Sequence, residues 1–283
     1  MKVAICTCAK YEEKYMKEWI DHHLQIGVDD IYIYDNNDDD KQKEIIDQYP
    51  DHVVRIDIRG LTKFNRKIPL DFYKEVTNIY DYVINIDLDE FLTFNPNQPI
   101  QNIKDFLALN PDHKYYHLSW QFRVNDKLLT YDDRPLKERF TDVLMLNNCL
   151  GKCIIATGIN AFIDIHFCHC KYPCYNGNNE LITCDIQHQN QEPNFKCLYL
   201  VHYITKTPEE YIKIKCKRNQ LCDPYLYTKQ YNYTINYYYV YNKITKESYN
   251  YFKQHLNNIP SYEELYNKSK DNKYITIDEA NKL

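Results

Sequence analysis

Glycine is scarce in this chain, with five residues among 283. A Rossmann dinucleotide site needs a G-x-G-x-x-G turn, and a Walker loop needs further glycines at fixed spacing. Neither pattern occurs in the sequence. The scarcity therefore argues against a glycine-rich loop that cradles a dinucleotide or a triphosphate.

Long apolar runs are absent as well. No window approaches 18 consecutive apolar residues, so we expect no transmembrane helix. The N-terminal sequence MKVAICTCAKYEEKY has an apolar stretch too short for a signal peptide. A net charge of −5 and an isoelectric point of about 6.1 argue against a basic surface for nucleic acid. We therefore expect a soluble, cytoplasmic protein whose main partner is not a nucleic acid.

Paired zinc-finger spacing is missing too, although the chain has eleven cysteines. Thiolates and imidazoles are good zinc ligands, and seven such residues gather in one segment. They are His166, Cys168, His169, Cys170, Cys174, Cys184 and His188. Their C-x-C-x3-C-x9-C spacing matches no zinc finger or ribbon. We interpret them as free thiols and histidines in a loop-rich insertion, with zinc or a disulfide as alternatives.

The first 90 residues alternate between strand and helix patterns. Apolar runs predict strands at 2–8, 31–34, 53–58 and 82–86, and helical periodicity predicts helices at 11–26, 41–49 and 70–80. Such alternation is typical of a mostly parallel α/β sheet flanked by helices. His22 and His23 fall on the apolar stripe of the first helix, which favours a structural role over a ligand role.

The alternation weakens after residue 92. A helix is predicted at 103–109, and strands are predicted at 115–122, 152–156, 163–167 and 197–204. Residues 126–140 are polar and loop-like. Thr207-Pro208-Glu209-Glu210 has the form of a capping box with proline at the first helical position, so a helix should begin there. We predict a main domain at 1–222 and a helical Tyr/Asn/Lys-rich appendage at 223–283.

The most informative run is DYVINIDLDEFL, residues 81–92. Asp87 and Asp89 directly follow an apolar strand, where bare carboxylates would be costly without a counter-charge. A hard divalent cation, shared with substrate phosphates, would supply that charge, and a capped strand end is the alternative. Thr7 and Asp35 also lie at strand ends, and ligands of parallel sheets bind beyond those ends. A second D-x-D, at residues 38–40, is interpreted as a solvated turn.

Four blocks in order resemble the GT-A glycosyltransferases of the family 2-like group, near family 92. They are EWIDHHLQIGVDDIYIYDNND, YVINIDLDEFL, DDRPLKERFT and YLVHYITKTPEEYIKIKCKRN, and together they span most of residues 2–220. Relatives of this kind make bacterial capsule, lipopolysaccharide and protein-linked glycans, and they occur in large DNA viruses. For a viral chain the resemblance would imply the host cytoplasm or the virion.

The resemblance implies a metal-dependent, inverting transfer of a sugar from a nucleotide-sugar to a hydroxyl of a glycan or glycoprotein acceptor. UDP is favoured over GDP as the nucleotide. Asp89 would coordinate the metal, Asp87 would contact metal or ribose, and His202 would be a third ligand. An imidazole ligand favours Mn²⁺ over Mg²⁺.

Other residues would bind the nucleotide. Thr7 and Asp35 would line the nucleoside pocket, and Lys206 would pair with the diphosphate as a point charge. These assignments, like the metal ligands, follow from the resemblance and from the position of the residues at strand ends.

An inverting transfer also needs a general base near the acceptor hydroxyl. Asp126 is the first candidate, ahead of Asp133 and Glu138. Val124 occupies the position at which many relatives carry an acid, so a degenerate nucleotide- or glycan-binding protein is one alternative. A sugar-phosphate nucleotidyltransferase is another, although it would normally need a glycine-rich N-terminal loop.

Overall fold

The computed structural model describes residues 1–61, 67–125, 127–146, 151–183, 193–218 and 235–283. The chain forms two compact units. The first comprises 1–121, 147–202 and 281–283, and the second comprises 122–146 and 203–280. The predicted domain boundary after residue 222 lies outside the described residues. The compact units have other limits, and the predicted division stays a prediction.

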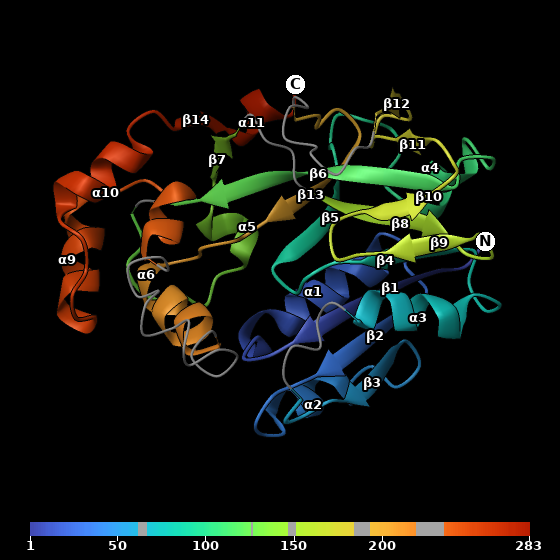
Figure 1. Cartoon of the computed structure of the whole chain (residues 1–283), viewed down its shortest axis with the longest axis horizontal. Coiled ribbons are helices and arrows are strands. Elements are labelled where there is room, and N and C mark those ends of the chain that lie inside the picture. The colour runs from blue at the N-terminus through green and yellow to red at the C-terminus, as the bar shows by residue number, and fades with distance from the viewer. Residues whose placement is uncertain (62–66, 126, 147–150, 184–192, 219–234) are drawn as a thin grey trace. The chain divides into compact units, whose positions relative to one another are not determined.

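The N-terminal half of the first unit is built on parallel strands in the order β4-β1-β2-β3 (Figure 1). Its elements are β1 (Val3–Ala9), α1 (Glu13–Gln25), β2 (Asp30–Asp35), α2 (Lys41–Ile46), β3 (Val53–Asp57), α3 (Ile68–Val76) and β4 (Tyr82–Asn85). The register places Ala9 opposite Asp35 and Cys6 opposite Asn85, so these strands end at one edge of the sheet. The predicted α/β alternation is confirmed.

The rest of the first unit adds mainly antiparallel pairs. β8 joins β4 and β6 antiparallel, and β5 pairs antiparallel with β13. The further elements are β5 (Glu90–Phe94), α4 (Ile103–Ala108), β6 (Tyr115–Val124), β8 (Gly151–Ala156), β9 (Ala161–Ile163), β10 (Cys168–Cys170), β11 (Cys174–Tyr175), β12 (Leu181–Ile182) and β13 (Leu198–His202). The mixed α/β sheet is thus parallel in its first half and mostly antiparallel thereafter.

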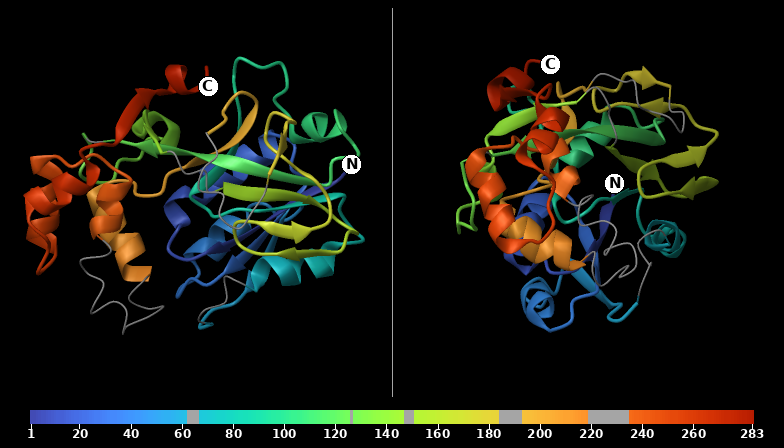
Figure 2. Two further views of the ribbon diagram at one scale, coloured as in Figure 1. Left: turned by 45° about the horizontal axis from the view of Figure 1, so that its top comes forward. Right: turned by 60° about the vertical axis from the view of Figure 1, so that its left-hand side comes forward.

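The single strand predicted at 163–167 is wrong. Instead β9 and β10 form a two-stranded antiparallel sheet of their own (Figure 2). The backbone N–H of Asp164 donates to the carbonyl oxygen of Phe167, 2.9 Å away, which closes a turn inside the predicted strand. An apolar run interrupted by such a turn cannot continue in one direction.

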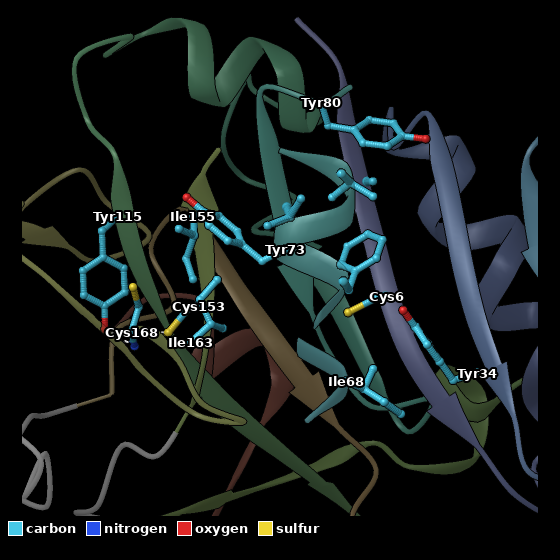
Figure 3. Packing of buried hydrophobic residues seen from close by; sticks show 14 of the residues in the cluster. Cys6, Tyr34, Ile68, Tyr73, Tyr80, Tyr115, Cys153, Ile155, Ile163 and Cys168 are labelled. Carbon is cyan, nitrogen blue, oxygen red and sulfur yellow. Dashed lines mark hydrogen bonds between the residues drawn. The ribbon is translucent and has the colours of Figure 1, made fainter. Parts of the chain in front are cut away.

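The core of the first unit lies on both faces of the sheet, because successive strand residues point to opposite sides. On one face Cys6, Ile155 and Tyr115 pack with Phe72 and other residues of α3 (Figure 3). On the opposite face Tyr116 packs against Phe106 of α4, with ring centroids 5.4 Å apart. Both sheet faces are therefore covered, and the site must lie at the edge where the strands end.

The second unit begins with the last residues of β6. Phe122–Val124 pair with β7 (Asp142–Met145), which pairs in turn with β14 (Lys273–Thr276). Its helices are α5 (Leu136–Arg139), α6 (Pro208–Glu210), the π-helix η1 (Tyr211–Cys216), α9 (Lys246–His255), α10 (Tyr262–Ser269) and α11 (Ile277–Ala280). The segment 126–140, predicted as loop, thus includes α5. The C-terminal segment contains β14 as well as helices.

The predicted capping box at the start of α6 is confirmed. The side chain of Thr207 accepts a hydrogen bond from the backbone N–H of Glu210, and the Glu210 carboxylate accepts one from the backbone N–H of Thr207. Glu210 also forms a buried ion pair with Arg139, with 3.1 Å between Nη1 and Oε1. The helix start is therefore tied to α5. Across the described part of the chain, none of the helices could cross a membrane.

Candidate functional site

The loop from Asp87 to Glu90, called the acidic loop below, joins β4 to β5. Its backbone folds back on itself, since the N–H of Glu90 donates to the carbonyl oxygen of Asp87 over 2.9 Å. The N–H of Asp87 donates to Glu90 Oε2 over 2.7 Å. Glu90 is fully buried, and burial raises the pKa of its carboxyl well above the usual range. The acidic loop is thus a closed turn.

Lys152 lies against this loop from β8. Its side chain is fully buried, and Nζ lies 3.0 Å from Asp87 Oδ2 and 3.7 Å from Glu90 Oε2. Burial alone would lower the pKa of Lys152, but the neighbouring carboxylates, above all Asp87, raise it. Desolvation likewise opposes ionisation of Asp87, yet the Lys152 ammonium outweighs it and lowers the pKa of that carboxyl. Lys152 and Asp87 therefore form an ion pair. Sequence reasoning missed this lysine.

His202 reaches the acidic loop from β13. The antiparallel register places it opposite Glu90. Its Nε2 lies 3.5 Å from Asp89 Oδ1, and its Nδ1 lies 3.8 Å from Glu90 Oε1. The indole ring of Trp120 packs beside the imidazole, with centroids 4.7 Å apart. Residues more than 100 positions apart thus meet because β5 and β13 pair.

Asp89 and His202 could supply two ligands to one divalent cation. Their donor atoms are 3.5 Å apart, a separation compatible with neighbouring positions around a single ion, and carboxylate oxygen and imidazole nitrogen both suit Mn²⁺. Asp87 faces Lys152 instead. Within the described ranges no three His, Cys, Asp or Glu side chains form a complete metal cluster. The remaining coordination positions would need ligands from elsewhere, such as substrate phosphates and water.

Three side chains of helix α1 form hydrogen bonds with the backbone of β5. Trp19 Nε1–H donates to the carbonyl oxygen of Glu90 over 2.7 Å. His22 Nε2–H donates to the carbonyl oxygen of Leu92 over 2.7 Å, and the Leu92 N–H donates to His23 Nε2 over 3.1 Å. These contacts give the EWIDHH block a physical role. The histidines bind backbone groups, as the structural interpretation expected.

Thr7 and Asp35 both lie at the strand edge and are both fully buried. Among the described residues Thr7 Oγ1 has no hydrogen-bond partner. Asp35 Oδ2 accepts from Arg55 Nε over 2.7 Å, and Oδ1 accepts from the N–H of Asn37 over 3.0 Å. The Asp35 carboxylate is therefore held by the protein itself. Binding of a nucleoside by these two residues stays a prediction.

The other predicted site residues belong to the second unit. Lys206 is buried and adopts a positive φ of 55°. Glu138 lies on α5, and Asp133 lies just before that helix. Asp126 lies outside the described residues. Their predicted roles toward diphosphate and acceptor stay predictions.

The cysteine segment surrounds a separate cavity of about 500 Å³ in the first unit. Cys168, Cys170 and Cys174 line it, together with Tyr115. Cys184 and His188 lie outside the described residues, so the choice between free thiols, zinc and a disulfide stays a prediction.

Comparison with known proteins gives one family and several distant relatives. A family model described as glycosyltransferase family 92 matches residues 1–274. A family 92 protein of Oryza sativa subsp. japonica is 29% identical over 112 residues, which cover 38% of this chain and 19% of that protein. A family 92 protein of Ricinus communis is 38% identical over 50 residues, 18% of this chain and 9% of that protein. The matched stretch thus spans about a fifth of the first relative and about a tenth of the second.

Solved structures with low similarity include two proteins in complex with a nucleotide-sugar. S. aureus TarS in complex with UDP-GlcNAc is 13% identical, with 47% of this chain and 37% of that chain covered and a TM-score of 0.32. A mannosyltransferase of Pyrobaculum calidifontis in complex with GDP-Man and Mn²⁺ is 12% identical, with 41% and 35% covered and a TM-score of 0.32.

Proposed function

Because the chain belongs to glycosyltransferase family 92, we propose that it transfers a sugar from a nucleotide-sugar to a hydroxyl of a glycan or protein-linked acceptor. One observation carries the proposal: the acidic loop and His202 meet beyond the carboxyl end of β4. Ligands of open α/β sheets bind at such ends. UDP is the nucleotide we favour, and inversion is the stereochemical course.

Asp89 and His202 are the proposed ligands of a divalent cation, with Mn²⁺ favoured over Mg²⁺ because one donor is an imidazole. When bound, the cation would stabilise negative charge on the departing diphosphate. The 3.5 Å separation of the two donor atoms supports this pairing. Asp87, with half of its side chain exposed, would contact the ribose of the donor.

The protein groups around the acidic loop keep it in place during the reaction. Lys152 holds one carboxylate oxygen of Asp87, and Trp19 holds the carbonyl oxygen of Glu90. A loop fixed in this way needs little reorganisation when the donor binds, which favours rapid transfer. An inverting transfer also requires a base, and Asp126 remains the first candidate, followed by Asp133 and Glu138.

Replacement of Asp89 tests this function. We expect Asp89→Asn to lower release of nucleoside diphosphate from a panel of UDP- and GDP-sugars with Mn²⁺ by about 100-fold or more, the scale seen when a group that stabilises transition-state charge is lost. A matched control is Asp40→Asn, which alters the exposed D-x-D of residues 38–40. That variant should keep full activity. Undiminished turnover by Asp89→Asn would contradict the assignment.

A binding protein without turnover is the second candidate. Val124 is fully buried in β6 at the position matched to an acid of many relatives. A thermal-shift screen with UDP and GDP, with and without Mn²⁺, separates the two functions. Metal-dependent stabilisation together with turnover supports the transferase, and stabilisation with no turnover of any nucleotide-sugar supports the binding protein.

A further inference from the structure

Lys152 is an unusual residue for the interior of a sheet. Lysine is almost never fully buried unless its charge is paired. Here its side chain has no exposed surface, and it lies on β8, whose neighbours on either side are β4 and β6. β4 leads directly into the acidic loop. A permanent positive charge is thus built in beneath that loop.

The two aspartates of the D-x-D pair have different partners. Asp87 Oδ2 lies 3.0 Å from Lys152 Nζ, whereas Asp89 Oδ1 lies 3.5 Å from His202 Nε2. Glu90, between the two groups, lies 3.7 Å from Lys152 Nζ and 3.8 Å from His202 Nδ1. One half of the acidic loop therefore already has a cation that belongs to the protein.

We propose that Lys152 is a positioning residue that holds Asp87 away from metal coordination and, through its fixed charge, limits the affinity of the Asp89–His202 pair for a divalent cation. The inference rests on the proposed function, in which a divalent cation binds that pair. Charges a few ångströms apart interact strongly near a protein interior, so a buried ammonium disfavours a second cation nearby. A donor diphosphate would add negative charge, and the cation would be retained chiefly when the donor is present.

The test measures Mn²⁺ binding directly, from the electron paramagnetic resonance signal of free Mn²⁺, with and without UDP. Lys152→Met and Lys152→Gln both remove the charge, and Lys152→Arg keeps it. We expect the dissociation constant for Mn²⁺ to fall by about tenfold in the neutral variants and to change by less than about twofold in Lys152→Arg. Gln keeps a hydrogen-bond donor for Asp87, so it serves if Met does not fold.

A double-mutant cycle then tests the role of Asp87. In the wild type the charge of its carboxylate is paired with the Lys152 ammonium, whereas the neutral variants lack that ion pair. Asp87→Asn should therefore weaken Mn²⁺ binding more in the Lys152→Met or Lys152→Gln background than in the wild type. Equal effects in the two backgrounds would show that Lys152 does not hold Asp87, and would overturn the inference.

The proposed function and the inference fail in distinguishable ways. If the wild type and Asp89→Asn bind Mn²⁺ equally poorly with UDP present, the proposed metal dependence is wrong. In that case the inference is supported if a neutral Lys152 variant binds Mn²⁺ although the wild type does not. A folded neutral variant, checked by circular dichroism and thermal melting, whose dissociation constant is unchanged or higher overturns the inference.

Discussion

The backbone N–H of Leu92 donates a hydrogen bond to Nε2 of His23, 3.1 Å away. Because this nitrogen accepts, the proton of the neutral imidazole must be on Nδ1, which lies 2.8 Å from the carbonyl oxygen of Trp19 and donates to it. Protonation of Nε2 would place an N–H donor of the imidazole directly opposite the N–H donor of Leu92. Burial, with a smaller contribution from His22, accordingly lowers the pKa of His23 well below its usual value.

This arrangement predicts a pH-dependent stability. The unfolded chain takes up a proton on His23 below about pH 6.5, whereas the folded chain does not until much lower pH. Stability contributed by neutral His23 is therefore complete above pH 6.5 and is lost as the pH falls below it. The slope should approach about 1.4 kcal/mol per pH unit for this one group. Urea denaturation from pH 7.5 to 5 measures it.

His23→Gln should be less stable at pH 7.5 but should lose less stability than the wild type on acidification. His52→Gln, at an exposed histidine, serves as the control and should follow the wild-type slope. Parallel acid slopes for the wild type and His23→Gln would contradict the prediction.

Trp19→Phe removes the indole N–H that donates to the acidic loop, and it keeps an aromatic ring. The buried carbonyl of Glu90 then loses its 2.7 Å hydrogen bond, which should lower the free energy of unfolding by about 1–3 kcal/mol. Because the carbonyl belongs to the acidic loop, we also expect kcat for transfer or donor hydrolysis to fall by about tenfold or more.

A matched control for this variant is Tyr73→Phe. Its hydroxyl donates to the partly buried carbonyl oxygen of Ile159 over 2.9 Å, on the other face of the sheet. Both variants should lose similar stability in urea, but only Trp19→Phe should lower kcat. Equal kcat in the two variants would show that the Trp19 contact is structural only.

Tyr11 adopts a positive φ of 60° just after β1. This conformation costs a residue with a Cβ about 1–2 kcal/mol, and asparagine tolerates it better than other residues do. The backbone N–H of Tyr11 donates to Asn37 Oδ1 over 3.0 Å, which any residue there could keep. Its hydroxyl donates to exposed Asp38, a contact worth little at the surface.

Tyr11→Asn should therefore raise the free energy of unfolding by about 0.5–1 kcal/mol in urea denaturation. Tyr11→Ala loses the phenol but keeps the strain, and it should be less stable than Tyr11→Asn. An alanine variant as stable as the asparagine variant would mean that backbone strain does not determine the difference.

Local patterns in the sequence predicted the first half of the sheet well. β1 to β4 and their helices follow from apolar periodicity, and parallel pairing then brings Asp35 and the acidic loop to one edge. The resemblance of the HY block led to the prediction that His202 binds the same metal ion as Asp89. The pairing of β5 with β13 gives it a structural reason.

Lys152 could not be found in the same way. Its place depends on β8 lying antiparallel to β4, with Ile154 opposite Ile84, and no local pattern fixes that register. In the sequence of its own strand, Lys152 is a charged residue among mostly apolar ones. The predicted strand at 163–167 failed for a related reason, since the turn at Asp164 depends on a contact that hydropathy does not register.

The register between β5 and β13 also bears on how this segment can change in evolution. Side chains alternate along a strand, so one residue inserted or deleted between Leu198 and His202 would turn the imidazole to the other face of the sheet. Substitutions within the strand leave that orientation intact. Homologues that keep the chemistry should therefore vary in composition here but not in length, and length variation should gather in the connections outside the strand.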